Sequence, residues 1–284
     1  MQIEEKSTNI KVGIQMDEIK IYELKRMDLR GAAVIDGFPS VGLVSTITAN
    51  YLIGILQMEQ IGILDSIHFP TVSVVRNSEP LNPVRIYAKT KMKEGEKQVV
   101  VFISEFQPPP NLIKLIAGTI LDWMVEQGCN LLISPEGLVI DRGEISGDDE
   151  DEEEGDGEGG NNNIEDLEAY GIGSTENARK LLGEFKIQQF QEGVISGVAG
   201  VLLNEGKRRG FDVISLLAEA RPNYPDARAA ARVIEAIDKI LLHMDIDVKP
   251  LYREAEGIEA RIMSMQQQAK TPTKKKAPIP QMYG

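Results

Sequence analysis

The chain has 284 residues, 42% hydrophobic and 26% charged, so it can form one large domain or two small ones with a substantial core. Its 44 acidic residues outnumber 31 basic ones, and the resulting net charge of −13 argues against general nucleic-acid binding, because phosphate contacts need a basic face. The single cysteine excludes an internal disulfide framework and a cysteine-based zinc cluster, and two histidines are too few for a His-rich catalytic metal centre.

The sequence contains no stretch that we expect to enter a membrane. The longest nearly uncharged stretch, residues 37–58, is interrupted by glycine, proline, serine, threonine and asparagine, so it is predicted to be a buried turn and helix. The first six residues also lack the basic-then-apolar order of a secretory signal. We therefore expect a cytoplasmic protein that does not bind membranes.

Strand patterns alternate with helix patterns along most of the chain. Asn111 is expected to cap one helix, and Gly128 and Gly210 are expected to end two of them. Alternation of strands and helices favours a mainly parallel sheet with helices on its faces, so the predicted fold class is α/β. The expected strands are residues 32–35, 84–89, 99–104, 130–134 and 212–217, and the expected helices are residues 41–56, 111–127 and 198–209.

Two further helices are expected to close the domain. Asp226 is the expected N-cap of the first, which carries one apolar stripe. The second follows Pro250, and its stripe has heptad spacing, which fits packing either on its own domain or against another subunit. The first stripe consists of Val233, Ile234, Ile237, Ile240 and Leu241, and the second of Leu251, Ala255, Ile258, Ile262 and Met265.

Two segments differ in composition from the rest of the chain. Residues 147–163, which mix acidic residues with glycines and asparagines, are expected to form a mobile acidic insertion in a single α/β domain over residues 1–265. Removing nine acidic charges of this insertion from −13 leaves −4, so the low pI describes the insertion and not the domain. Binding of a cation or a basic partner is the alternative role. Residues 266–284 are expected to form a flexible tail rich in proline and lysine.

The turn at residues 37–45 is the strongest candidate for small-molecule binding. It follows a predicted strand and opens a helix, which is where α/β proteins bind phosphates. However, Gly42 is followed by Leu43 instead of the lysine of a P-loop, and Phe38 and Pro39 stand where a dinucleotide motif needs its second glycine. The glycines are therefore expected to serve a tight turn and close helix–sheet packing, with a nucleotide or phosphate ligand as the alternative.

No other group of residues predicts catalysis. Cys129 is expected to be a small buried hydrophobe, and His68 and His243 are expected to be structural. Glu219 and Arg221 follow a predicted strand at the sheet edge where α/β enzymes carry chemistry, but we interpret them as a structural ion pair. We therefore predict that the protein is not an enzyme, with no catalytic residue, no cofactor and no metal site.

Seven short segments, taken together, form a recognisable pattern. They are GFPSVGLV (37–44), ANYLI (49–53), MEQIG (58–62), HFP (68–70), GVISGVAGVLL (193–203), LLAEA (216–220) and YPDARAA (224–230). In this order they resemble the proteasome assembly chaperone family, and the resemblance covers residues 31–262. The chain departs from the family in Ser40, where a second turn glycine is common, and in the acidic insertion.

This resemblance implies an α/β fold similar to nucleoside phosphorylases and a non-enzymatic role in assembly of the proteasome core. Eukaryotic members act as a heterodimer on the α-ring and archaeal relatives form homo-oligomers, so the chain resembles an archaeal homologue that associates with itself. Met282, Tyr283 and Gly284 fit the hydrophobic–tyrosine–any-residue (HbYX) motif of proteasome activators. The resemblance therefore implies that these three residues dock between α-subunits of the 20S core particle.

The chemistry of this terminus suits end-on insertion into a pocket between subunits. Met282 would supply apolar contact, the Tyr283 ring would pack while its hydroxyl forms a hydrogen bond, and the Gly284 carboxylate would meet a lysine. Two other functions stay open from the sequence. One is an enzyme acting on a nucleoside or phosphate at residues 37–45, and the other is a scaffold whose acidic insertion and tail serve another complex.

Overall fold

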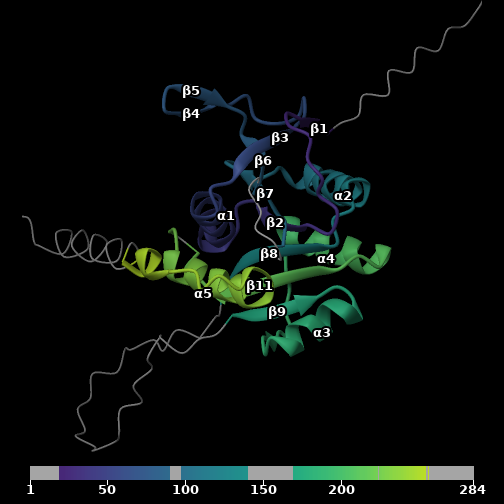
Figure 1. Ribbon diagram of the computed structural model, residues 1–284, viewed down its shortest axis with the longest axis vertical. Helices are drawn as coiled ribbons and strands as arrows, with labels where there is room; N and C mark the ends of the chain where they lie inside the picture. The colour runs from purple at the N-terminus through teal and green to yellow at the C-terminus, as the bar shows by residue number, and fades with distance from the viewer. Residues whose placement is uncertain (1–18, 90–96, 140–168, 223, 254, 256–284) are drawn as a thin grey trace, which may run out of the picture.

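The computed structural model describes residues 19–89, 97–139, 169–222, 224–253 and 255. Its centre is a nine-stranded mixed sheet in the order β1-β3-β6-β7-β2-β8-β11-β9-β10 (Figure 1). A separate hairpin pairs β4 (Val74–Arg76) with β5 (Glu79–Leu81). The strands of the large sheet are β1 (Lys20–Glu23), β2 (Ala33–Gly37), β3 (Glu59–Asp65), β6 (Val84–Ala88), β7 (Val99–Ser104), β8 (Leu131–Leu138), β9 (Tyr170–Gly173), β10 (Gln188–Gln189) and β11 (Val213–Glu219).

The centre of the sheet is parallel. β7, β2, β8 and β11 run side by side in one direction, with Ile35 of β2 opposite Val101 of β7 and Ile133 of β8. Every residue of β2 and β7 is buried, as expected for strands covered by helices on both faces. The predicted α/β fold with a mostly parallel core is therefore confirmed. The flanks differ from the prediction, because β6, β3 and β1 extend the sheet with antiparallel pairs and β9 is antiparallel to β11.

Two pairs of helices cover the two faces of the sheet. α1 (Val44–Ile55) and α5 (Ala227–Ile237) contact each other on one face, while α2 (Pro110–Gln127) and α4 (Gly197–Arg209) contact each other on the opposite face (Figure 1). α3 (Glu176–Glu184) contacts β9. Within the described ranges, no helix has both the length and the apolar character needed to span a bilayer.

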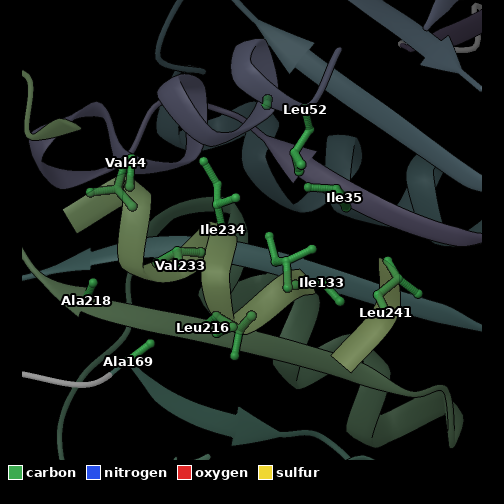
Figure 2. Close-up of a cluster of buried hydrophobic side chains, with 14 of the residues drawn as sticks. Ile35, Val44, Leu52, Ile133, Ala169, Leu216, Ala218, Val233, Ile234 and Leu241 are labelled. Atoms are coloured by element: carbon green, nitrogen blue, oxygen red, sulfur yellow. The ribbon is translucent and has the colours of Figure 1, made fainter. Parts of the chain in front are cut away.

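Each face of the sheet carries its own hydrophobic core. Side chains of the sheet such as Ile35 and Ile133 lie beneath Ile234 of α5 in the first core (Figure 2). In the second core, on the α2 and α4 face, the rings of Phe102 and Trp123 meet edge to face with centroids 5.3 Å apart. Alternate residues of the central strands thus enter opposite cores, which fixes the register of each strand.

The helix expected at residues 41–56 begins later than predicted. Gly42 and Leu43 both have left-handed backbone, with φ of 61° and 52°, so the segment divides into a 3-10 turn at Val41–Leu43 and α1. A left-handed leucine is not encoded by apolar spacing, which is why the pattern gave one continuous helix.

The ends of α2 correct one prediction and confirm another. Asn111 is not the N-cap, because Pro109 takes that position and Pro110 opens the helix, where a missing N–H leaves no hydrogen bond unmade. The predicted stops at Gly128 and Gly210 are confirmed, since both residues cap their helices with left-handed φ.

The closing helices agree with the sequence as far as they are described. Asp226 caps α5 by accepting a hydrogen bond from the Ala229 amide at 3.0 Å. The predicted stripe is buried, with its last two members in a π-helical turn, Asp238–Leu242, that follows α5. Leu251 and Ala255 of the second stripe are buried in the same core, whereas its last three members lie outside the described residues. The insertion at 147–163 and the tail at 266–284 also lie outside them, so the predicted division of the chain stays a prediction.

Candidate functional site

The turn between β2 and α1 is filled by neighbouring atoms. A Cβ added to Gly137 of β8 would overlap the carbonyl oxygen of Val41, and one on Gly37 would lie 2.6 Å from a carbonyl oxygen of β7. Gly42 needs its left-handed φ, and a Cβ there would lie 3.0 Å from the Cβ of Ala220. These contacts confirm that the turn glycines serve a tight turn and close packing.

Serine oxygens accept hydrogen bonds from backbone amides of the turn. The Ser40 carbonyl accepts a hydrogen bond from the Leu43 amide at 2.9 Å, and the Ser40 hydroxyl oxygen accepts one from the Ser45 amide at 3.1 Å. The Ser45 hydroxyl in turn donates to the Phe38 carbonyl. A phosphate at this position would need such amides as donors. The internal bonds of the turn therefore occupy groups that a phosphate or nucleotide would use.

Two carboxyl groups beside the turn were not singled out from the sequence. Asp36, at the end of β2, is 2% exposed, and it accepts hydrogen bonds from the Phe38 amide at 3.0 Å and the Ser134 hydroxyl at 2.8 Å. Burial raises the pKa of Asp36 to about 6 despite these two bonds. Burial, and secondarily the charge of Asp36, raises the pKa of Glu136 well above its ordinary value. An acidic residue directly after the apolar run at residues 32–35 was the available signal.

The arrangement of these carboxyls fits a structural role. Both oxygens of Asp36 are bonded within the fold, one to the turn and one to β8, so this side chain ties the turn to the neighbouring strand. Across the described part of the chain, histidine, cysteine, aspartate and glutamate do not gather in threes as they would around a metal ion.

Two of the seven segments that carry the family resemblance, GFPSVGLV and YPDARAA, meet at this turn. The Asp226 amide donates to the Gly42 carbonyl at 2.8 Å, and the Asp226 carboxylate accepts from the Arg221 amide at 3.2 Å. The Arg221 guanidinium donates to the Tyr224 hydroxyl at 2.6 Å and lies 5.3 Å from the centre of that ring. Another of these segments, GVISGVAGVLL, leads into α4 on the opposite face of the sheet. The pattern therefore describes a turn-and-helix junction together with a separate packing helix.

The other candidate residues have structural surroundings. Cys129 is buried, and burial raises the pKa of its thiol to about 11, which confirms the prediction of a small buried hydrophobe. His68 lies exposed in a turn, while His243 follows the last turn after α5 with its ring 5.7 Å from that of Phe185. The guanidinium of Arg221 bonds Tyr224, so its ion pair with Glu219 stays a prediction.

The residues predicted to bind a partner lie outside the described residues. They are Met282, Tyr283 and Gly284, and the docking motif that they form stays a prediction.

Comparisons with known proteins extend over nearly the whole chain. A model of the PAC2 family matches residues 34–266. PbaA of Pyrococcus furiosus, an archaeal homologue of proteasome-assembly chaperone, is 31% identical, with 88% of this chain and 93% of PbaA covered and a TM-score of 0.70. PbaB of the same organism, an archaeal proteasome activator, is 26% identical, with 88% and 100% covered and a TM-score of 0.70. An uncharacterised protein of Methanocaldococcus jannaschii is 26% identical over 89% of this chain and 93% of its own.

Proposed function

Because the chain belongs to the PAC2 family, we propose that it is a non-enzymatic chaperone or regulator that binds the proteasome core particle. The observation that carries this proposal is the likeness to both PbaA and PbaB over 88% of the chain. One of these proteins is a homologue of an assembly chaperone and the other is an activator. The proposal therefore covers both assembly of the α-ring and activation of the finished particle. It places the protein in the cytoplasm together with the core particle.

The bonding of the turn after β2 supports action by binding alone. An enzyme acting on a nucleoside or phosphate at this sheet edge would keep amide donors and an acid or base available to its substrate. Here the Leu43 and Ser45 amides bond Ser40, and both oxygens of Asp36 bond groups of the fold. This favours the chaperone over the enzyme as the reading of residues 37–45.

The tail supplies the docking contact in this proposal. Burial of the Tyr283 ring in a pocket between α-subunits would contribute roughly 2 kcal/mol, with Met282 adding apolar contact and the Gly284 carboxylate meeting a lysine. In polyproline-like form, at roughly 3.1 Å per residue, residues 269–282 would reach about 40 Å. The folded domain then needs no close fit to the docking pocket.

Self-association would turn this weak contact into a strong one. A homo-oligomer presents several tails to one core particle, and linked binding of this kind strengthens attachment by a factor of roughly 10² to 10⁴. The proposal therefore includes a homo-oligomer, as implied by the resemblance to archaeal relatives.

The test is capture of purified proteasome core particle by the full chain and by a variant that lacks residues 282–284. The full chain should retain the particle and the shortened chain should lose most of it. Replacing Lys274, Lys275 and Lys276 by serine is the matched control, because it keeps the length and the motif and alters chiefly the salt dependence. Equal capture by the full and shortened chains would contradict docking by the tail. Capture by neither would contradict the proteasome as partner.

A further inference from the structure

A cavity of about 310 Å³ lies between the edge of the sheet and α2. This volume is at the lower end of the range for small-molecule sites. Its lining comes from β1, β3, β6, the segment after β1 and the last turns of α2, and so excludes the turn after β2. The apolar lining residues are Ile21, Met27, Leu29, Ile61, Ile86 and Trp123, and the others are Glu23, Lys25, Arg26, Gly62 and Gln127.

The cavity has a clear origin in the register of three strands. Glu23 of β1 is opposite Gly62 of β3, and Gly62 is opposite Ile86 of β6. The middle position of this row has no side chain, and an added Cβ would lie 3.0 Å from the Tyr22 carbonyl oxygen and 3.3 Å from Ile86 Cδ1. The register of β3 against β6 also shifts between Gln60 and Gly62, so both Ile61 and Gly62 line the cavity. A glycine in a bulged strand thus lines the space beside α2.

Among the charged groups that line the cavity, Arg26 is held least tightly. Its Nε lies 3.9 Å from Glu23 Oε2, at the outer limit of an ion pair, and its side chain is 95% exposed. Lys25, by contrast, has its Nζ 2.6 Å from Glu59 Oε2. Glu23 also accepts a hydrogen bond from the Gln127 side-chain amide at 2.9 Å. A guanidinium held this loosely can turn to a carboxylate and donate two parallel hydrogen bonds to it.

We propose that this cavity binds an organic monocarboxylate with an apolar body, such as a medium-chain alkanoate or an arylalkanoate. The apolar side chains in the lining, among them Ile21 and Trp123, can contact the apolar body, and Arg26 can bind the carboxylate. Lys25 is paired with Glu59, so Arg26 is the cation of the lining that can turn to a ligand carboxylate. The site does not depend on proteasome binding, because neither the tail nor the turn after β2 contributes to its lining.

The tryptophan of the cavity provides a direct readout. Trp123 is the single tryptophan of the chain, is 6% exposed and lines the cavity, so its emission reports occupancy. Titration of the full chain with decanoate or 4-phenylbutanoate is expected to change this emission saturably. 1-Decanol should bind at least about tenfold more weakly, since it offers Arg26 no charged acceptor. A linear response to both carboxylates, or equal binding of decanoate and decanol, would overturn the proposal.

Two pairs of variants locate the site. Ile21→Phe adds bulk to the wall of the cavity and should weaken the response, whereas Tyr22→Leu changes the opposite face of the same strand and should leave it unchanged. Arg26→Gln should lower decanoate affinity to that of decanol, while Lys180→Gln on α3 removes a charge elsewhere and should have no effect. Because the Arg26 side chain is exposed, this result stands even where Ile21→Phe impairs folding. Unchanged decanoate binding by Arg26→Gln would overturn the proposal.

Discussion

The turn after β2 and the cavity beside β1 are both built around glycines, yet one region is filled and the other is hollow. At the turn, the missing side chain of Gly137 on β8 lets the Val41 carbonyl of the turn pack directly against the strand. At the sheet edge, an added Cβ on Gly62 would lie 3.0 Å from the Tyr22 carbonyl oxygen and 3.3 Å from Ile86 Cδ1, and the residue lines the cavity beside α2. A strand glycine therefore does not by itself mark an open space. The elements packed around it decide whether a cavity lies beside it.

This difference separates the two regions in function. The filled turn has its amides and its buried carboxyl engaged in the fold, which supports the proposal that the protein acts by binding other proteins. The hollow edge has a loosely held cation beside a cavity lined by both apolar and polar side chains, which supports a small-molecule site. Each contrast can be tested by substitution.

The largest effect is expected for Gly137→Ala. Its Cβ would overlap a backbone oxygen, which no side-chain rotation can move, so we expect a loss of about 3 kcal/mol in the free energy of unfolding. Urea denaturation followed by circular dichroism measures it. The control is Gly54→Ala in α1, where nothing lies within 4 Å and helix propensity should add about 0.5–1 kcal/mol. Equal stability of the two variants would show that the turn is not tightly filled.

The buried carboxyl predicts a pH dependence. The pKa of Asp36 is about 6 in the folded chain and roughly 4 when unfolded, so the folded state holds a proton that the unfolded state releases. The contribution of this proton binding to the free energy of unfolding is therefore fully present below about pH 4 and is lost as the pH rises through about 6. The free energy of unfolding of Asp36→Asn, relative to that of its parent, should rise by up to about 3 kcal/mol between about pH 4 and pH 7.5. Urea unfolding at both pH values tests this.

The control for Asp36 is Asp122→Asn on the surface of α2, which should show no such gain. A gain of the same size in both variants would assign the pH dependence to general surface charge. No gain in Asp36→Asn would mean that the carboxyl stays ionised in the folded protein.

A smaller loss is expected where α5 joins the turn. Asp226→Ala removes the acceptor for the Ala229 and Arg221 amides and should cost about 1–2 kcal/mol. Asp226→Asn keeps a side-chain oxygen and should cost less than half as much. Thermal and urea unfolding measure both. Equal losses would show that the charge of Asp226, and not its capping bonds, stabilises the junction.

The smallest effect on stability is expected for Gly62→Ala. Its Cβ would lie 3.0 Å from the Tyr22 carbonyl, but β1 is the edge strand and can shift, so the change should stay within about 1 kcal/mol. The same variant should weaken decanoate binding, because the cavity becomes narrower. A loss as large as that of Gly137→Ala, measured by urea unfolding, would contradict the contrast between the filled and hollow regions.

The sequence predicted the parts of the fold that depend on local patterns. The strand at residues 99–104, the stops at Gly128 and Gly210 and the cap at Asp226 all follow from neighbouring residues. The strand β1 was missed because its four residues are mostly exposed and owe their conformation to pairing with β3.

The sites were harder to predict than the fold. The glycines that follow a predicted strand located the turn at residues 37–45, but the burial of Asp36 and the contact of Gly42 with Asp226 depend on long-range packing. The cavity depends on the register of β1, β3 and β6 and on a bulge, neither of which has a local sequence signal.

The measurement that tests the central claim most directly is the affinity of the full chain for purified proteasome core particle, compared with Tyr283→Ala and Tyr283→Phe. Tyr283→Ala should bind far more than tenfold more weakly, because the loss multiplies over every tail that engages. Tyr283→Phe keeps the ring and should lose much less, and all three proteins should unfold at the same urea concentration. If Tyr283→Ala binds as tightly as the parent, the tail does not dock and the central claim is contradicted.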